Sequence, residues 1–219
     1  MSKGIAVVDI GSTGIRVLVA KIVDGRAPQI IAKADVACKG VVKELSVENV
    51  DEVSRALKRI ITRIKEQTGL IVKSAYFNIS GDKLSFMPNT DSIVISSKDD
   101  DIEESSVTNK TIGMLLDRIA SVELYEDETL VDVMPRQYYV AYGDGHFDAK
   151  VSDPAGLNCT KIKADADVVV GKSSYIEEVK KCAEGADIEI DGFIPFAFAM
   201  PHVISDSVFN SEDCSEKSV

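Results

Sequence analysis

The strongest constraint on the fold is an apolar run near the start of the chain that ends in a carboxylate and a turn. Residues 5–8 read Ile-Ala-Val-Val, Asp9 follows, and the turn Gly11-Ser12-Thr13-Gly14 leads into a second β-branched segment. An unbroken apolar run is typical of a strand covered on both faces. Glycines permit backbone torsions that turn N–H groups towards an anion. The sequence therefore predicts a strand, a tight turn and a second strand that can cradle a phosphate, with Ser12 and Thr13 adding hydroxyl donors.

Two common phosphate-binding motifs do not fit this turn. The patterns G-x-G-x-x-G and G-x-x-x-x-G-K-[ST] both lead into a helix whose N-terminus holds the phosphate, whereas a strand follows here. One remaining interpretation is the phosphate hairpin found in actin and sugar kinases, in which Asp9 would organise Mg²⁺ through water, since that ion keeps much of its hydration shell. The other is an ordinary turn that needs glycine for its geometry. Both stay open.

Charge and composition narrow the function classes. The 219 residues include 25 basic and 36 acidic residues, which give a net charge of −11. This charge repels a phosphate backbone, so we expect no nucleic-acid partner. The chain starts without a signal-peptide pattern and has no apolar run near the roughly 18 residues that span a bilayer, so a cytoplasmic location is expected. The four cysteines lie far apart and are expected to be reduced thiols.

Residues 1–84 are expected to form the first part of a large α/β subdomain. Two turns separate three predicted antiparallel strands, which end near residue 36. A helix follows, with Asn49 as its N-cap and Gly69 as its stop. Residues 73–79 then read as a strand. Three strands, a helix and a strand are the order of a ribonuclease-H-like core.

Residues 85–163 are expected to form a small inserted α+β subdomain. Its predicted elements are a strand at 91–96, a helix at 105–121, and strands at 129–142 and 160–170. Its aromatic residues could mark an interaction surface, although ordinary packing on a half-buried sheet explains them as well.

Residues 164–206 are expected to return to the large subdomain, and residues 207–219 to form a flexible tail. Ser174 and Glu177 make a capping box for a helix that ends at Gly185. A strand starts near Ile188, and helical spacing returns at 196–204. The tail is rich in Ser, Asp and Glu and has little to bury.

The order of these motifs resembles the FtsA family of actin-like bacterial cell-division proteins over nearly the whole chain. The resemblance rests on the following segments: Asp9-Ile10-Gly11-Ser12-Thr13, Lys39-Gly40-Val41-Val42, Asn78-Ile79-Ser80-Gly81 and Asp153-Pro154-Ala155-Gly156-Leu157-Asn158. An insertion after Ser80-Gly81 is characteristic of that family, because actin and MreB place their small subdomain elsewhere. The pilus-assembly protein PilM has a similar plan and is the close alternative.

The resemblance implies an α/β protein with a ribonuclease-H-like core of the actin and sugar-kinase superfamily. It implies ATP and Mg²⁺ as cofactors of the full-length protein, with Asp9 positioning the metal through water. The backbone of Gly11 and Gly14 and the hydroxyls of Ser12 and Thr13 would hold the terminal phosphates. Arg16 would neutralise charge nearby. No catalytic residue is assigned, and the chain is expected to be a structural adaptor more than an enzyme.

The same resemblance implies the partners. An FtsA-like protein polymerises and links the FtsZ ring to the inner face of the cell membrane at the division site. The inserted subdomain would contact neighbouring protomers and other division proteins, FtsZ would bind a part beyond this chain, and a C-terminal helix beyond Val219 would bind the membrane. The chain is therefore expected to be an N-terminal part that binds ATP weakly or not at all.

Two alternatives remain. A sugar kinase or exopolyphosphatase of the same superfamily also begins with such a hairpin, although we find no carboxylate placed as a catalytic base. The chain could also act as a free-standing interaction module.

Overall fold

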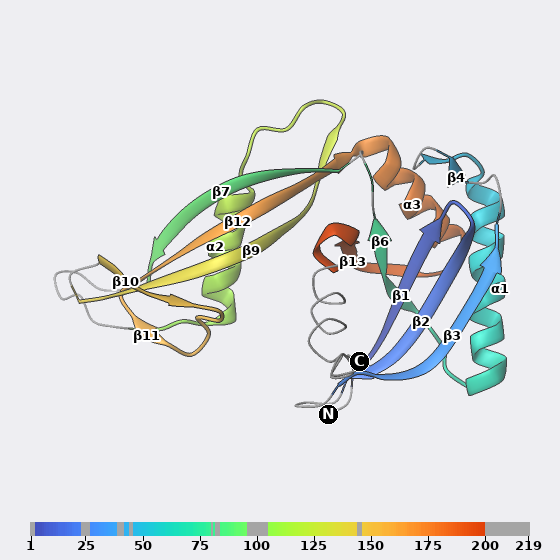
Figure 1. Cartoon of the computed structure of the whole chain (residues 1–219), viewed down its shortest axis with the longest axis horizontal. Coiled ribbons are helices and arrows are strands. Elements are labelled where there is room, and N and C mark those ends of the chain that lie inside the picture. The colour runs from blue at the N-terminus through green and yellow to red at the C-terminus, as the bar shows by residue number, and fades with distance from the viewer. Residues whose placement is uncertain are drawn as a thin grey trace, which may run out of the picture. The chain divides into compact units, whose positions relative to one another are not determined.

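The computed structural model describes residues 3–22, 27–38, 42–43, 46–79, 81, 84–95, 105–143 and 146–199. The chain divides into two compact units (Figure 1). The first comprises Met1–Lys83 with Ser174–Val219, and the second comprises Leu84–Ser173.

The first unit is built on a five-stranded sheet with the order β13-β6-β1-β2-β3. Its strands are β1 (Lys3–Gly11), β2 (Gly14–Ile22), β3 (Gln29–Ala37), β6 (Ser74–Ile79) and β13 (Glu189–Pro195). The pairs β1–β2 and β2–β3 are antiparallel, whereas β6 runs parallel to both β1 and β13. This is the predicted ribonuclease-H-like order.

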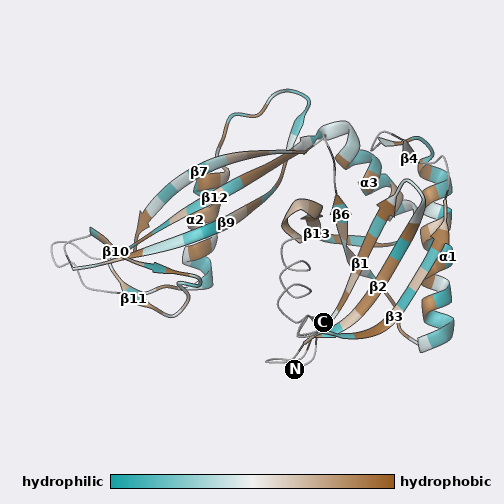
Figure 2. Cartoon of the chain, viewed as in Figure 1, coloured by the Kyte–Doolittle hydropathy of each residue, from teal (hydrophilic) through white to brown (hydrophobic). Residues whose placement is uncertain are grey.

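Two helices of the first unit, α1 (Val50–Thr68) and α3 (Ser173–Gly185), lie side by side. A Cβ added at Gly185 would come 2.5 Å from the Ser54 hydroxyl, so the glycine permits this close approach. As predicted, Asn49 caps α1 by accepting a hydrogen bond from the Glu52 amide, and Gly69 ends it with φ 74°. In Figure 2, α1 alternates between brown and teal, as an amphipathic helix does.

A short hairpin of β4 (Val42–Lys43) and β5 (Ser46–Val47) is joined to α3 by one carboxylate. The Ser46 hydroxyl and the Val47 amide each donate to Glu178 Oε2 at 2.9 Å. The core of this unit is apolar, and its large buried side chains include Val8, Ile15, Val17, Leu57, Ile64, Phe77 and Ile176.

The second unit contains a four-stranded antiparallel sheet with the order β10-β9-β12-β7. Its strands are β7 (Leu84–Val94), β9 (Glu128–Tyr142), β10 (His146–Val151) and β12 (Lys161–Lys172). The helix α2 (Asn109–Ala120) packs on one face of this sheet (Figure 1). Two short strands, β8 (Ser105–Ser106) and β11 (Asn158–Cys159), pair with each other. A separate core includes Leu115, Ile119, Val140, Ile162 and Val168.

Several bounds differ from the predicted ones. The helix expected at 105–121 is α2, which starts at Asn109 because Thr108 caps it, and residues 105–106 form β8 instead. Strand β7 begins at Leu84, where a start at 91 was expected, and β10 was not predicted. Strand β12 stays in the small sheet through Lys172, so this unit extends past the expected boundary at 163.

Some predictions fall outside the described residues, among them the tail at 207–219 and the Lys39-Gly40-Val41 segment. A helical turn is present at 196–199, and the rest of the expected helix also lies outside the described part. Among the described helices, none is long and apolar enough to cross a membrane.

Candidate phosphate-binding hairpin

The predicted hairpin is present between β1 and β2. Gly11 pairs with Gly14, so Ser12 and Thr13 form a two-residue turn, and both residues are exposed. The turn is tied to the end of β3 by a hydrogen bond of 3.4 Å from the Cys38 amide to the Thr13 carbonyl. The hairpin is therefore formed as expected, and its polar tip faces solvent.

The two glycines serve a steric role, where the sequence had suggested a torsional one. Neither Gly11 nor Gly14 adopts a left-handed φ. A Cβ at Gly14 would lie 2.7 Å from the Val36 carbonyl oxygen, and one at Gly11 would lie 3.3 Å from the Gly14 oxygen. These glycines allow the hairpin to pack against β3 and to close tightly.

Beside this turn, three polar side chains from three adjacent strands form a hydrogen-bonded row. The sheet register places Asp9 of β1 opposite Arg16 of β2 and opposite Asn78 of β6. Arg16 Nη1 donates to Asp9 Oδ2 at 3.0 Å, and Asn78 Nδ2 donates to Asp9 Oδ1 at 2.8 Å. Each carboxylate oxygen of Asp9 thus accepts one hydrogen bond from a neighbouring strand.

The alternation of the strands explains why this row is not buried. Side chains along a strand point to opposite faces, and Val8, Val17 and Phe77, which flank the row in sequence, are buried on the other face. The side chains of Asp9 and Arg16 keep 35% and 54% of their surface exposed. The carboxylate is therefore oriented by its partners and still reachable by water.

Asn78 was not assigned as a site residue from the sequence. It appears there only as the first residue of the Asn-Ile-Ser-Gly motif that ends a strand. The contact with Asp9 depends on the parallel register of β6 with β1, which joins residues 69 positions apart. An asparagine at the end of the strand that follows the helix was the available signal.

The chemistry of the row fits a hydrated magnesium ion and a phosphate. A carboxylate held at a strand end can accept hydrogen bonds from metal-bound waters, and the Arg16 guanidinium has the geometry that suits phosphate oxygens. Within the described residues, no group of three His, Cys, Asp or Glu side chains gathers into a direct metal-ligand cluster. Asp9 would therefore contact a magnesium ion through water and not as part of a direct ligand cluster.

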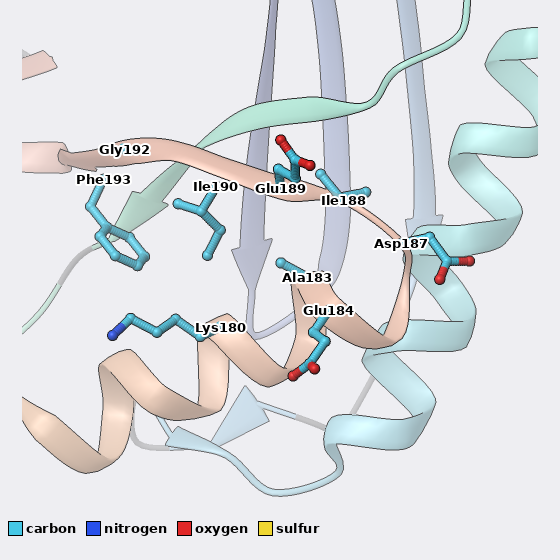
Figure 3. A pocket seen from close by; sticks show the side chains of 9 residues that line it. All are labelled: Lys180, Ala183, Glu184, Asp187, Ile188, Glu189, Ile190, Gly192 and Phe193. Carbon is cyan, nitrogen blue, oxygen red and sulfur yellow. The ribbon is translucent and has the colours of Figure 1, made fainter.

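A separate hollow of about 680 Å³ lies between α3 and β13. Figure 3 shows Lys180 and Glu184 on the helix and Ile190 and Phe193 on the strand around it. None of the predicted phosphate-site residues lines this hollow.

Cys38, Cys159 and Cys182 are buried, reduced cysteines, as expected, whereas Cys214 lies outside the described residues. Burial raises the pKa of the Cys182 thiol to about 12, and the nearby Glu178 carboxylate adds to the shift. Cys182 is therefore a protonated core residue, with no role in the hairpin.

In comparison with known protein families, a match is found for the second unit. Residues 81–170 match the family model described as the SHS2 domain inserted in FtsA. The match coincides with the small sheet and its helix α2. Over these residues the chain is similar to the inserted domain of FtsA.

The sequence is 21% identical to the cell division protein FtsA of Bacillus subtilis (strain 168) over 83% of this chain and 39% of that protein. It is 23% identical to FtsA of Streptococcus pneumoniae serotype 2 over 88% of this chain and 39% of that protein. FtsA of Escherichia coli (strain K12) is 20% identical over 85% of this chain and 41% of its own length. The chain thus spans about two-fifths of the FtsA sequences that it matches.

A solved structure supports the fold. A protein in the PilM-PilN type IV pilus biogenesis complex superposes with a TM-score of 0.57 at 11% identity, over 95% of this chain and 52% of that one. The predicted recognition of FtsA and the predicted fold class are both confirmed. At this identity, the likeness to the pilus protein shows the fold alone.

Proposed function

We propose that the hairpin around Asp9 is one side of an ATP-binding site in an actin-like cell-division protein. The observation that carries the proposal is a half-exposed carboxylate held by Arg16 and Asn78 beside an exposed Ser-Thr turn. A group that served only stability would gain little from such an exposed position. A carboxylate oriented from both sides is suited to order water around a cation.

Each residue has a distinct part in this proposal. The Asn78 amide fixes one oxygen of Asp9, and Arg16 supplies positive charge next to the turn. The amides and hydroxyls of Ser12 and Thr13 would donate to terminal phosphate oxygens. Mg²⁺, when bound, would offset the phosphate charge, and Asp9 would hold its water shell.

The whole protein would polymerise and link the FtsZ ring to the cytoplasmic membrane at the division site. The matched SHS2 unit and the similarity to FtsA along most of the chain support this role. In this proposal the second unit is an inserted subdomain that contacts neighbouring protomers and other division proteins. The FtsZ site and the membrane contact would belong to parts outside the chain.

Two alternatives follow from the same hairpin. A pilus-assembly role is the second candidate, because the protein of the PilM-PilN complex has the same fold. A phosphotransferase or phosphohydrolase of the superfamily, such as a sugar kinase or exopolyphosphatase, would also use a phosphate hairpin. A phosphoryl-transfer assay on the full-length protein separates this enzymatic function from a structural one.

The ATP site is tested by NMR titration of the ¹⁵N-labelled chain with Mg-ATP. We expect millimolar or weaker binding, with shifts centred on the amides of Gly11 to Gly14, since the other side of the site lies outside the chain. Asp9→Ala should abolish these shifts, whereas Asp51→Ala, an exposed aspartate on α1, should preserve them. Shifts centred elsewhere, or an unchanged response of Asp9→Ala, would rule out the site.

A further inference from the structure

The face of the small sheet opposite α2 carries a group of positive and aromatic side chains. The strand register aligns them in two adjacent rows across four strands: Val94, Lys161, Ala141 and Phe147 in one, and Ser92, Lys163, Tyr139 and Lys150 in the other. The alternation of β12 supports this assignment, because the intervening Ile162 and Ala164 are fully buried in the core on the α2 side. We call these two rows the basic-aromatic patch.

The three lysines of the patch lie over its aromatic rings. The distances from Nζ to the ring centroid are 4.7 Å for Lys163 and 5.8 Å for Lys150 at Tyr139, and 5.2 Å for Lys161 at Phe147. Such cation–π contacts hold ammonium groups close to a surface while leaving them able to bind an anion. In the part of the chain that the structure describes, neither Lys150 nor Lys161 takes part in an ion pair.

One carboxylate beside the patch orients its central ring. Asp165 accepts hydrogen bonds from the Thr90 hydroxyl at 2.8 Å and from the Tyr139 hydroxyl at 3.0 Å. Its Oδ1 lies 3.4 Å from Lys163 Nζ. The hydrogen bond from Thr90, followed by that from Tyr139, lowers the pKa of Asp165. Asp165 pairs with Lys163 alone among the three lysines, so these four groups together keep a positive charge in a chain whose net charge is −11.

Apolar surface lies among these charges. Val94 is 67% exposed and Phe147 is 37% exposed. A ligand that fits this surface therefore needs negative charge together with apolar side chains.

The spacing of the rows favours a peptide. Along β7, β9 and β12 the rows are two residues apart, about 7 Å, which equals the spacing of side chains on one face of an extended peptide. On β10 a bulge between Phe147 and Ala149 keeps the same alignment with three residues. We propose that the basic-aromatic patch binds an extended acidic segment of a partner protein, with acidic side chains at the lysines and apolar ones over Val94 and Phe147. This proposal does not depend on the ATP site.

The test uses the whole chain and a defined probe, an eight-residue peptide of alternating Glu and Tyr. NMR titration at low salt should shift amides of β9, β10 and β12 around the patch, and the affinity should fall as salt screens the lysines. The double variant Lys150→Glu/Lys161→Glu should bind roughly tenfold more weakly or not at all, because like charges then face each other. A peptide of alternating Lys and Tyr should not bind.

The matched control reverses two exposed lysines outside the patch, Lys65→Glu on α1 and Lys110→Glu on α2, with the same change in net charge. It should bind the Glu-Tyr peptide within about twofold of the wild type. Circular dichroism should show that both double variants are folded. Equal weakening in both variants would reduce the effect to overall charge and overturn the proposal.

A second outcome would also overturn it. Vesicles of phosphatidylglycerol and phosphatidylcholine test an anionic lipid surface with the same variants. Sedimentation of the wild type with these vesicles, together with no shift by the Glu-Tyr peptide, would assign the patch to lipid. Absence of binding to either probe up to several millimolar peptide would equally reject the acidic partner.

Discussion

The two sheets of this protein present charge on an open face in different ways. In the first unit, a single carboxylate is fixed between Arg16 and Asn78, which come from the strands on either side. In the second, three lysines spread over two aromatic rings with one carboxylate beside them. The first arrangement positions one acceptor group, whereas the second distributes positive charge over a surface. This contrast supports the small-ligand site proposed for the first unit and the protein interface proposed for the second.

The largest expected effect tests whether the two units are also separate in stability. Phe77 in the first unit and Leu115 in the second are both fully buried. Truncation of either side chain to Ala removes apolar contacts and leaves a cavity, which costs about 3–5 kcal/mol for Phe and about 2–5 kcal/mol for Leu. Hydrogen exchange should show lost protection in the first unit for Phe77→Ala and in the second for Leu115→Ala.

The control for this pair is Met114→Ala, because Met114 precedes Leu115 on α2 and is 55% exposed. It should change the free energy of unfolding by less than about 0.5 kcal/mol. Loss of protection throughout the chain from either core variant would mean that the two units unfold together. The two units would then differ in their exposed faces but not in their stability.

A second comparison places a Gly→Ala substitution in each unit. We expect it to lower the free energy of unfolding in the first unit and to raise it in the second. Gly14→Ala brings a Cβ to 2.7 Å from the Val36 carbonyl, so the hairpin or β3 must shift, and we expect a loss of about 1–3 kcal/mol. Gly113→Ala meets no atom within 4 Å in the middle of α2 and should stabilise by about 0.5–1 kcal/mol. Thermal unfolding measures both changes. A neutral Gly14→Ala would show that the turn and β3 are free to separate.

The helices show how local signals made part of the fold predictable. Asn49 and Gly69 define both ends of α1 through contacts within a few residues, and the structure has these caps as expected. The strands of the small sheet depend on distant partners. The expected strand at 91–96 is the end of a longer strand, β7, which begins at Leu84. Pro88 is tolerated within β7 because it is an edge strand, where the missing proline N–H breaks no ladder.

At the candidate site, too, contacts between residues far apart in the sequence could not be predicted. Asp9 and the Gly-Ser-Thr-Gly turn stand next to each other in the sequence, so their proximity could be predicted. Asn78 joins them only through the parallel pairing of β6 with β1, which the sequence does not state. The glycines were expected to provide unusual torsions, yet Gly14 is needed because β3 approaches it closely.

An effect of about 1 kcal/mol is expected in the pH dependence of the first unit alone. The pKa of the Cys182 thiol is raised from 9.0 to about 12 by burial, so the folded state retains a proton that the unfolded chain releases. The stability that this group contributes is complete below pH 9 and is lost as pH rises towards 12. Between pH 9 and 10 the loss should be about 1 kcal/mol. Denaturant unfolding of the wild type and of Cys182→Ala at both pH values isolates this contribution from that of other titrating groups. An equal change in the free energy of unfolding of the two proteins would mean that Cys182 does not lose its proton on unfolding between pH 9 and 10, and would contradict the raised pKa.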